Sequence, residues 1–451
     1  MSLTLTSSRG TTRSPSRGVR LGAALLALVV AFGVTRIITT RGGDDATSVP
    51  VQTDPAVEIA ELEQRITADT DDADAWQRLA PLYLVRAAGS GDRALVLQAE
   101  HAVDEAIRLR PDDMATYHAH GALELTLHQF AAAREVGLAA HAAHPDSPDA
   151  LAILVDTSIE LGRYDDVDMY LRELLDRRPN AAALARVSYL REIRGDLPGA
   201  RVAMSQAETA ALADASESAA ITTLVGDLAL AAGKPSMALA AYERAAAREP
   251  DSSLTELGMA RALAALDRTD AAIDILTTSI DRFPEPALLT LLGELYEATG
   301  RTDEASAIYV QTATLIDRHG ASGEDNSLEA ARFHADHADP DDAVRFARIA
   351  FHNRRTVFAA DVMAWSLTRA GQADEALPFA ELANRLGTDS VDMHVHTAAA
   401  YSAAGRAAEA KEALTEAFTG SPYSFPELRP VAIELARQLG ITVPDTWAAR
   451  G

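Results

Sequence analysis

The chain has 451 residues, 48% of them hydrophobic and 5% aromatic, and it carries a formal net charge of -25. Residues 1–43 hold six arginines and no acidic residue, so the remainder has 35 basic against 66 acidic side chains, and a body this acidic disfavours binding to nucleic-acid phosphates. The absence of cysteine excludes disulfides, thiolate metal sites and thiol catalysis.

The amino-terminal segment is predicted to target the chain to a membrane. Residues 1–20 are polar and basic, and we expect them to be disordered. Residues 21–40 begin with the apolar run LGAALLALVVAFGV and reach the length of a transmembrane helix or signal anchor if Arg36 extends to the interface. The alternatives are a cleaved signal peptide, which would leave the chain secreted, and an apolar cytoplasmic segment. Four arginines before this segment against two after it favour a single-pass protein with its body outside the cytoplasm.

A linker and a lone helix separate this segment from the body of the chain. Residues 41–56 are rich in Gly, Pro, Asp and Ser without periodicity, which is typical of a linker. From Val57 to Ala68, apolar residues recur at helical spacing among acidic ones, which predicts a single amphipathic helix that caps the body of the chain.

A fixed spacing organises the body of the chain. Pro111, Pro145 and Pro179 lie 34 residues apart, each after an apolar helical stretch, and the interval returns between Pro250 and Pro284. A period of this length predicts stacked helical hairpins, because one hairpin cannot bury its own apolar stripe. Within a predicted solenoid of residues 57–422, ten hairpins follow from these anchors: 73–111, 114–145, 148–179, 182–212, 219–250, 253–284, 286–317, 324–355, 357–388 and 391–422.

Several hairpins also carry small and aromatic residues at matching positions. These are Trp76, Leu79-Ala80 and Tyr83; Leu161-Gly162-Arg163-Tyr164; Val225-Gly226, Gly233 and Tyr242; and Leu292-Gly293, Tyr296, Gly300-Arg301 and Tyr309. A small residue suits the place where two helices touch, an aromatic fills the hole beside it, and proline ends the second helix. With these motifs the chain resembles the tetratricopeptide repeat (TPR) family, in a membrane-anchored bacterial form. The resemblance implies an all-α, right-handed superhelical solenoid that binds a protein or peptide on its concave side.

The period is interrupted in places, and there the local geometry is expected to differ. The interruptions are extra residues at 87–93, further extra residues after 212, and a Gly-rich loop at His319–Ser327. At the carboxy end, residues 423–451 are predicted to hold a capping helix at about 427–439, followed by a loose tail from Ile441 to Gly451.

No arrangement of residues points to catalysis. The chain lacks a Gly-rich phosphate loop ending in Lys-Ser or Lys-Thr, a His-Glu-x-x-His motif and a Gly-x-Ser-x-Gly motif. Since a repeat fills the predicted folded part, the sequence predicts a protein that is not an enzyme and that requires no cofactor.

Histidines gather in two regions and suggest a second hypothesis. His141 and His144 are one helical turn apart, as are His334 and His337, so each pair is able to point two imidazoles in one direction. Paired imidazoles with nearby carboxylates are typical of nickel, zinc or copper sites. The second hypothesis is therefore divalent metal handling outside the cytoplasm. The alternative is that these histidines are solvated residues at helix ends, and convergence of three ligands on one point would distinguish the two.

The TPR resemblance implies a groove along one face of the first helix of each hairpin. The residues on that face are His118, Ala122, Asp156, Glu160, Arg186, Arg194, Thr223, Asp227, Arg261, Glu294, Glu297, Arg332, Asp336, Asp361, Trp365 and Arg369. Both signs of charge alternate with small residues, which suits a mixed-charge peptide; the alternative is a plain solvated surface. We take nine as the predicted peptide-binding groove, with Trp365 as its aromatic contact: Asp156, Arg186, Asp227, Arg261, Glu294, Arg332, Asp361, Trp365 and Arg369. The main hypothesis is thus a scaffold for protein-protein interaction.

Overall fold

The computed structural model describes residues 55–90, 93–211, 215–321, 323–422 and 427–448. The predicted segments 1–20 and 21–40, and nearly all of 41–56, lie outside these residues. Among the helices that the structure describes, none is both long and apolar enough to cross a bilayer.

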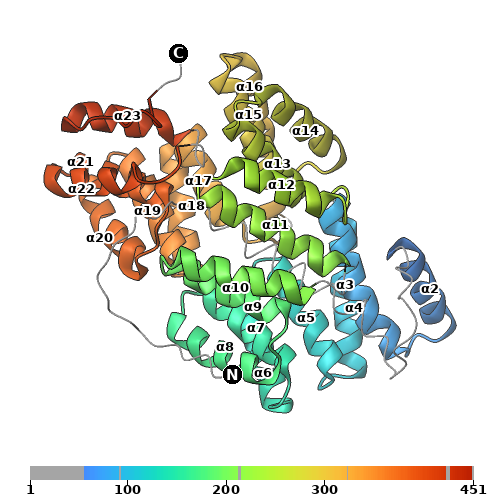
Figure 1. The fold of residues 1–451 in the computed structure, drawn as a ribbon. Coiled ribbons are helices and arrows are strands. Elements are labelled where there is room, and N and C mark those ends of the chain that lie inside the picture. Colours follow the sequence, from blue (N-terminus) through green and yellow to red (C-terminus); the bar gives the residue numbers. More distant parts are fainter. Residues whose placement is uncertain (1–54, 91–92, 212–214, 322, 423–426, 449–451) are drawn as a thin grey trace.

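The described residues form an all-helical solenoid with no β-strand, as the sequence predicts (Figure 1). Ten helical hairpins, numbered here in chain order, stand between a lone helix α2 (Pro55–Ala68) and a last helix α23 (Leu428–Leu439). The hairpins are α3 (Ala73–Ser90) with α4 (Arg93–Leu109), α5 (Met114–Thr126) with α6 (Phe130–Ala143), α7 (Pro148–Glu160) with α8 (Tyr164–Arg177), α9 (Ala181–Ile193) with α10 (Leu197–Ala210), α11 (Ala215–Ala231) with α12 (Pro235–Ala246), α13 (Ser253–Ala265) with α14 (Thr269–Arg282), α15 (Pro286–Ala298) with α16 (Thr302–Ala321), α17 (Ser327–His337) with α18 (Pro340–Asn353), α19 (Val357–Arg369) with α20 (Ala373–Ala383), and α21 (Val391–Ala403) with α22 (Ala407–Ala417). A short 3-10 helix, η2 (Asn384–Leu386), follows α20.

The regularly spaced prolines mark the joints between hairpins. Pro111, Pro145 and Pro179 each lie just after a second helix and one or two residues before the N-cap of the next first helix. The N-cap side chains accept hydrogen bonds from backbone amides of the first turn: Asp113 from Ala115, Ser147 from Ala150, and Asn180 from Ala183. Each such cap stabilises a helix start by about 1 kcal/mol, so the sequence sets the joint locally.

The helices of a hairpin approach closely where the small residues were expected. Tyr242 of α12 is fully buried between Gly226 and Gly258, and a Cβ at either glycine would lie 2.5 or 2.4 Å from its ring. Tyr309 occupies the same kind of hole beside Gly293, at 2.4 Å from a Cβ built there. Glycine therefore provides the room that each tyrosine fills.

Two expectations about irregular segments need correction. The loop expected at 319–327 is helical in its first part, because α16 continues to Ala321. The tail from Ile441 is not loose as far as the structure describes it. Trp447 is buried, with its ring against Phe418 at 5.0 Å and its Nε1 donating to the carbonyl of Gly420 at 3.3 Å. An indole of this size covers the exposed end of the last hairpin.

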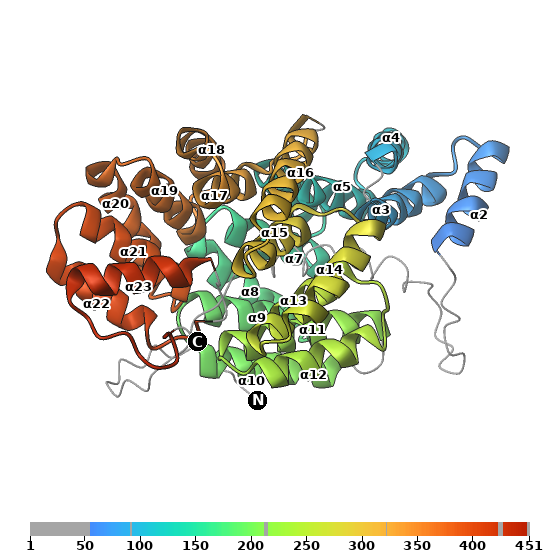
Figure 2. The same cartoon turned by 90° about the horizontal axis from the view of Figure 1, so that it is seen from above.

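The stack returns on itself, so that hairpins 2–4 meet hairpins 8–10. We call this contact the seam; it consists of residues 127–129, 160–164 and 193–195 on one side and 323–326, 354–357 and 387–388 on the other. The amide of Asp325 donates to the carbonyl of Leu127 at 3.0 Å, and Thr388 Oγ1 donates to the carbonyl of Ile193 at 2.5 Å. Figure 2 shows the arc from above, with α2 and α23 at opposite sides of the molecule.

Buried apolar and charged groups reinforce the seam. One hydrophobic cluster holds Leu154 and Tyr189 from one side together with Val357 and Met393 from the other. Arg354 is also buried there, with an Nη atom 3.3 Å from Glu160 Oε2. Contacts between residues nearly 200 positions apart thus join the second to fourth hairpins to the eighth to tenth.

The seam predicts a difference between glycines with the same backbone conformation. Gly162, Gly195, Gly300 and Gly371 all have φ between 69° and 78°, yet only the first two face the seam. An added Cβ would lie 2.3 Å from the carbonyl oxygen of Arg355 at Gly162 and 2.2 Å from that of Gly387 at Gly195, whereas it meets nothing within 4 Å at Gly300 or Gly371. All four alanine variants lose about 1 kcal/mol from the left-handed backbone.

We expect Gly162→Ala and Gly195→Ala to lose a further 1–3 kcal/mol or so from the clash at the seam. Urea unfolding of the four variants measures this difference, with Gly300→Ala and Gly371→Ala as matched controls. Equal losses of stability in all four variants would contradict the close backbone contact at the seam.

Candidate functional site

The nine predicted groove residues all lie on first helices, from α7 to α19. Successive first helices are joined by polar contacts: Gln77 donates to Thr116 at 2.8 Å between α3 and α5, and the hydroxyls of Thr223 and Thr255 are 2.8 Å apart between α11 and α13. We call the surface carried by these helices the first-helix surface. Internal pairing decides which of its polar groups are accessible, because a side chain that is bound internally is not free for a partner.

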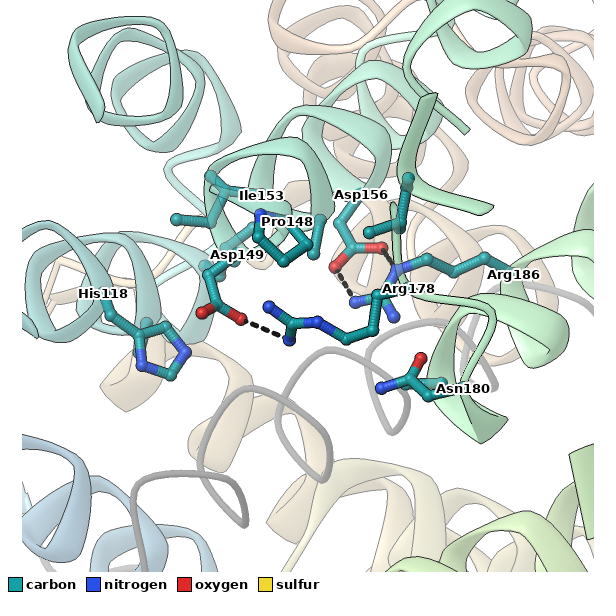
Figure 3. A pocket seen from close by; sticks show the side chains of 13 residues that line it. His118, Pro148, Asp149, Ile153, Asp156, Arg178, Asn180 and Arg186 are labelled. Carbon is teal, nitrogen blue, oxygen red and sulfur yellow. Dashed lines mark hydrogen bonds and ion pairs between the residues drawn. The ribbon is translucent and has the colours of Figure 1, made fainter. Parts of the chain in front are cut away.

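A pocket opens on this surface between α5, α7 and α9 (Figure 3). It is lined by His118, Ala122, Leu125, Pro148, Asp149, Ala152, Ile153, Asp156, Leu174, Arg178, Asn180, Ala182 and Arg186. The cavity measures about 60 Å³, which accommodates a few water molecules or the end of one side chain.

Two ion pairs border the pocket, and they differ in burial. Arg186 donates to both carboxylate oxygens of Asp156, at 2.7 and 2.6 Å, and both side chains are about 95% buried. Removing one partner of such a pair costs about 3–5 kcal/mol, because the other charge stays buried. Arg178 donates to Asp149 at 2.9 Å, and both of these side chains remain partly exposed. The first pair therefore joins α7 to α9, while the second is within reach of a ligand.

Arg178 and Asp149 are not among the residues predicted from the sequence. Asp149 lies in the first turn of α7 and Arg178 is the C-cap of α8, so neither belongs to the middle of a first helix, where groove residues were expected. The proline spacing is the sequence feature that could have pointed to these two residues. Asp149 follows the joint at Pro145, and Arg178 directly precedes Pro179.

The predicted residues of hairpins 5–8 are held by internal partners. Asp227 accepts a hydrogen bond from the Tyr242 hydroxyl at 2.7 Å, and the charge of Arg261 acts on the same carboxylate. Glu294 is buried with His337, at 3.4 Å between Oε1 and Nε2. Burial lowers the pKa of His337, but Glu294 outweighs this and leaves that pKa above the ordinary value. These pairs hold neighbouring hairpins together.

A second buried network joins α17, α19 and α21. Arg332 lies 3.0 Å from Asp392 and 3.9 Å from Asp361, and Asp361 also receives His396 Nδ1 at 3.0 Å. Burial lowers the pKa of His396, yet Asp361 and its neighbours keep that pKa above the ordinary value. The carboxylates are therefore satisfied by groups of the chain itself.

Trp365 lies in the same network and is not an exposed contact as the sequence suggests. Its ring stacks on His396 at 4.4 Å, its Nε1 donates to Asp336 at 2.7 Å, and only 3% of the residue is exposed. Arg369 lies with its guanidinium 5.5 Å from the same ring and donates to the carbonyl of Ala335. The helix of the next hairpin covers the face that the repeat pattern had left open.

The histidines of the metal hypothesis have separate neighbours. His141 meets Tyr170 edge-on at 6.4 Å, whereas His144 Nε2 contacts the carbonyl of Asp112 at 2.7 Å. His334 stacks on Phe346, whereas His337 pairs with Glu294 and stacks on Tyr309. Within the described ranges, no three His, Cys, Asp or Glu side chains are grouped so as to hold a metal ion.

One buried acid of this surface was not singled out from the sequence. Glu192 of α9 is 8% exposed, and its side chain has no hydrogen-bond or ion-pair partner among the described residues. Burial raises the pKa of Glu192 to about 8, and repulsion from Asp227 of α11 adds to the shift. The repeat pattern points instead to Arg194, two residues further on, and Arg194 pairs with Asp168 at 2.8 Å.

Comparisons with known proteins identify the type of repeat. Residues 229–292, from the end of α11 into α15, match the family model described as tetratricopeptide repeat. A search of curated proteins finds no match. The chain is therefore an all-helical repeat scaffold with a TPR segment, an architecture consistent with protein-protein interaction.

Solved structures give distant similarities over most of the chain. The human IFIT1 dimer with PPP-AAAA is 12% identical, with a TM-score of 0.46, over 89% of this chain and 97% of that one. The APC/C hetero-tetramer Cut9-Hcn1 is 14% identical, with a TM-score of 0.40, over 84% and 92%. The yeast Tom70 is 12% identical, with a TM-score of 0.36, over 88% and 92%. Similarity at this level names no partner for the present chain.

The shifted pKa of Glu192 predicts a dependence of stability on pH. The folded chain holds the Glu192 proton up to about pH 8, whereas the unfolded chain releases it near pH 4.5. An acid with a raised pKa therefore contributes stability at low pH that is lost as the pH rises between these values. With about 1.4 kcal/mol for each pH unit, an interval of about 3.5 pH units corresponds to a loss on the order of 5 kcal/mol.

Urea unfolding at pH 5 and pH 8.5 tests this dependence. We expect wild type to lose more stability over that interval than Glu192→Gln, which is neutral throughout. Glu243→Gln, on the exposed side of α12, serves as the control and should behave like wild type. The same loss of stability in Glu192→Gln and wild type would contradict a raised pKa of Glu192.

Proposed function

We propose that the chain is a non-enzymatic scaffold that binds a protein or peptide segment on the first-helix surface, on the predicted concave side. The pocket between α5, α7 and α9 is the observation that carries the proposal. It combines an apolar wall, from Ile153 and Leu174, with the partly exposed pair of Asp149 and Arg178. Such a combination suits one anchoring side chain with polar groups of a peptide on either side.

The internal ion pairs support binding by keeping the pocket in one shape. Arg186 and Asp156 are already fixed to one another, so α7 and α9 lose little conformational entropy when a peptide arrives. Arg178 uses one of its nitrogens for Asp149, which leaves further N–H donors toward the pocket. The buried pair thus provides rigidity and the exposed pair provides contacts.

The proposal also places the scaffold outside the cytoplasm, held to a membrane by residues 21–40. It is supported by the apolar run LGAALLALVVAFGV and by the excess of arginines before it. An anchored scaffold of this kind would hold its partner near the membrane surface.

A peptide-display selection tests the binding proposal. Random dodecapeptides panned against the full chain, purified in detergent, should yield sequences that bind with micromolar affinity or better. Arg178→Ala should weaken a selected peptide by about tenfold, because a partly buried arginine contact is lost. Arg348→Ala is the matched control, since Arg348 pairs with Glu375 at 3.0 Å on outer, second helices. Failure to select any peptide, or equal weakening by both variants, would overturn the proposal.

Protease treatment of intact cells tests the predicted location. External protease should digest the repeats of the full chain, and deletion of residues 21–40 should release the chain from the membrane fraction. Repeats that stay intact until the cells are opened would refute the proposed orientation.

A further inference from the structure

We propose that the pocket between α5, α7 and α9 is a size filter, which accepts one small aliphatic side chain of the bound peptide, of the size of valine, and excludes aromatic rings. The inference rests on the proposed function, because this side chain belongs to the peptide that binds the first-helix surface. It adds the chemical class of the anchoring side chain and names Ile153 as the residue that sets its size.

The volume of the cavity limits what enters it. The pocket offers about 60 Å³, whereas an apolar cavity that holds benzene measures about 150 Å³. In proportion, the pocket has room for about two or three carbon atoms instead of the six of a phenyl ring. The isopropyl group of valine fills such a space, and the rings of phenylalanine, tyrosine and tryptophan exceed it.

The lining of the pocket favours an aliphatic side chain over a charged one. Five apolar side chains form most of its wall: Ala122, Leu125, Ala152, Ile153 and Leu174. The two buried charges are paired with each other, since Arg186 donates to both carboxylate oxygens of Asp156 at 2.7 and 2.6 Å. An ionic side chain would lose its hydration there without meeting a net opposite charge. An aliphatic side chain loses no hydrogen bond and buries its apolar area.

The side chain of Ile153 is one wall of the pocket, and glycines of two neighbouring helices fix its position. A Cβ added to Gly121 of α5 would lie 3.1 Å from Ile153 Cδ1, and one added to Gly137 of α6 would lie 2.9 Å from Ile153 Cγ2. The isoleucine therefore packs directly against the backbone of both helices, and only 5% of the residue is exposed. Because no space is left behind it, the size of residue 153 determines the space in front of it.

Polar groups that line the same pocket suit the peptide backbone beside the anchor. Asn180 Oδ1 accepts the amide of Ala183 at 3.0 Å, so the N–H groups of Asn180 are the part that a peptide carbonyl is able to meet. Arg178 also lines the pocket and uses one Nη atom for Asp149 (Figure 3). Since main-chain carbonyls are the same in every peptide, discrimination between anchoring side chains falls to the apolar wall.

A series of synthetic peptides tests the filter. An alanine scan of one peptide from the dodecapeptide selection identifies its anchor, and the peptide is then made with alanine, valine, leucine or phenylalanine at that position. The valine form should bind wild type at least about tenfold more tightly than the alanine or phenylalanine form, with leucine between them. Tightest binding by the phenylalanine form would overturn the filter.

Two variants change the size of the pocket in opposite directions. Ile153→Ala removes three carbon atoms from the wall and should shift the preference from valine to leucine or phenylalanine by about tenfold. Ala152→Val adds two carbon atoms at a half-buried position and should weaken the valine form by about tenfold relative to the alanine form. Ile273→Ala, which shortens a buried side chain of α14 outside the pocket, is the matched control and should keep the wild-type order.

The outcomes separate the filter from the proposed function. Circular dichroism establishes that each variant is folded, and Ala152→Val decides the question if Ile153→Ala does not fold. An unchanged order of the four peptides in the folded pocket variants, or the same change in Ile273→Ala, would refute the filter. If Arg178→Ala still weakens the peptide in that case, the proposed function stands without it. Failure to select any peptide would overturn the proposed function and the filter together.

Discussion

The carbonyl oxygens of Arg355 and Gly387 occupy the space where a side chain at position 162 or 195 would be. This close approach of two parts of the backbone is the constraint on which the rest of the structure depends. In an open solenoid each repeat touches only its neighbours. Here hairpins 2–4 also support hairpins 8–10, and the same hairpins 2–4 carry the pocket, whose shape is therefore tied to distant residues.

The charges of the first-helix surface serve mainly to join one helix to the next. Asp156 with Arg186, Glu294 with His337, and Asp361 with His396 all bridge neighbouring hairpins. Buried pairs of this kind add little net stability, since desolvation offsets much of their attraction, but they disfavour any other register of the helices. In the proposed binding mode, recognition falls to polar side chains that stay partly exposed, such as Arg178 and Asp149.

Two polar residues of this region were not singled out from the sequence. Arg178 borders the pocket with part of its side chain exposed, and Glu192 is buried on the last turn of α9. In the proposed binding mode, the pocket holds one anchoring side chain, and the partly exposed pair of Asp149 and Arg178 adds specificity.

The sequence by itself determined the helices, their joints and the hairpin count, because prolines, N-caps and glycine-tyrosine contacts act over a few residues. It also placed Asp156 and Arg186 on first helices, where both line the pocket, since helical periodicity is local. The tertiary structure alone decided which of these charges remain accessible, where Trp365 and Trp447 are buried, and that residues such as Leu127 and Asp325 meet. A repeating pattern describes contacts between neighbours, whereas the seam depends on the summed curvature of all the hairpins between its two sides.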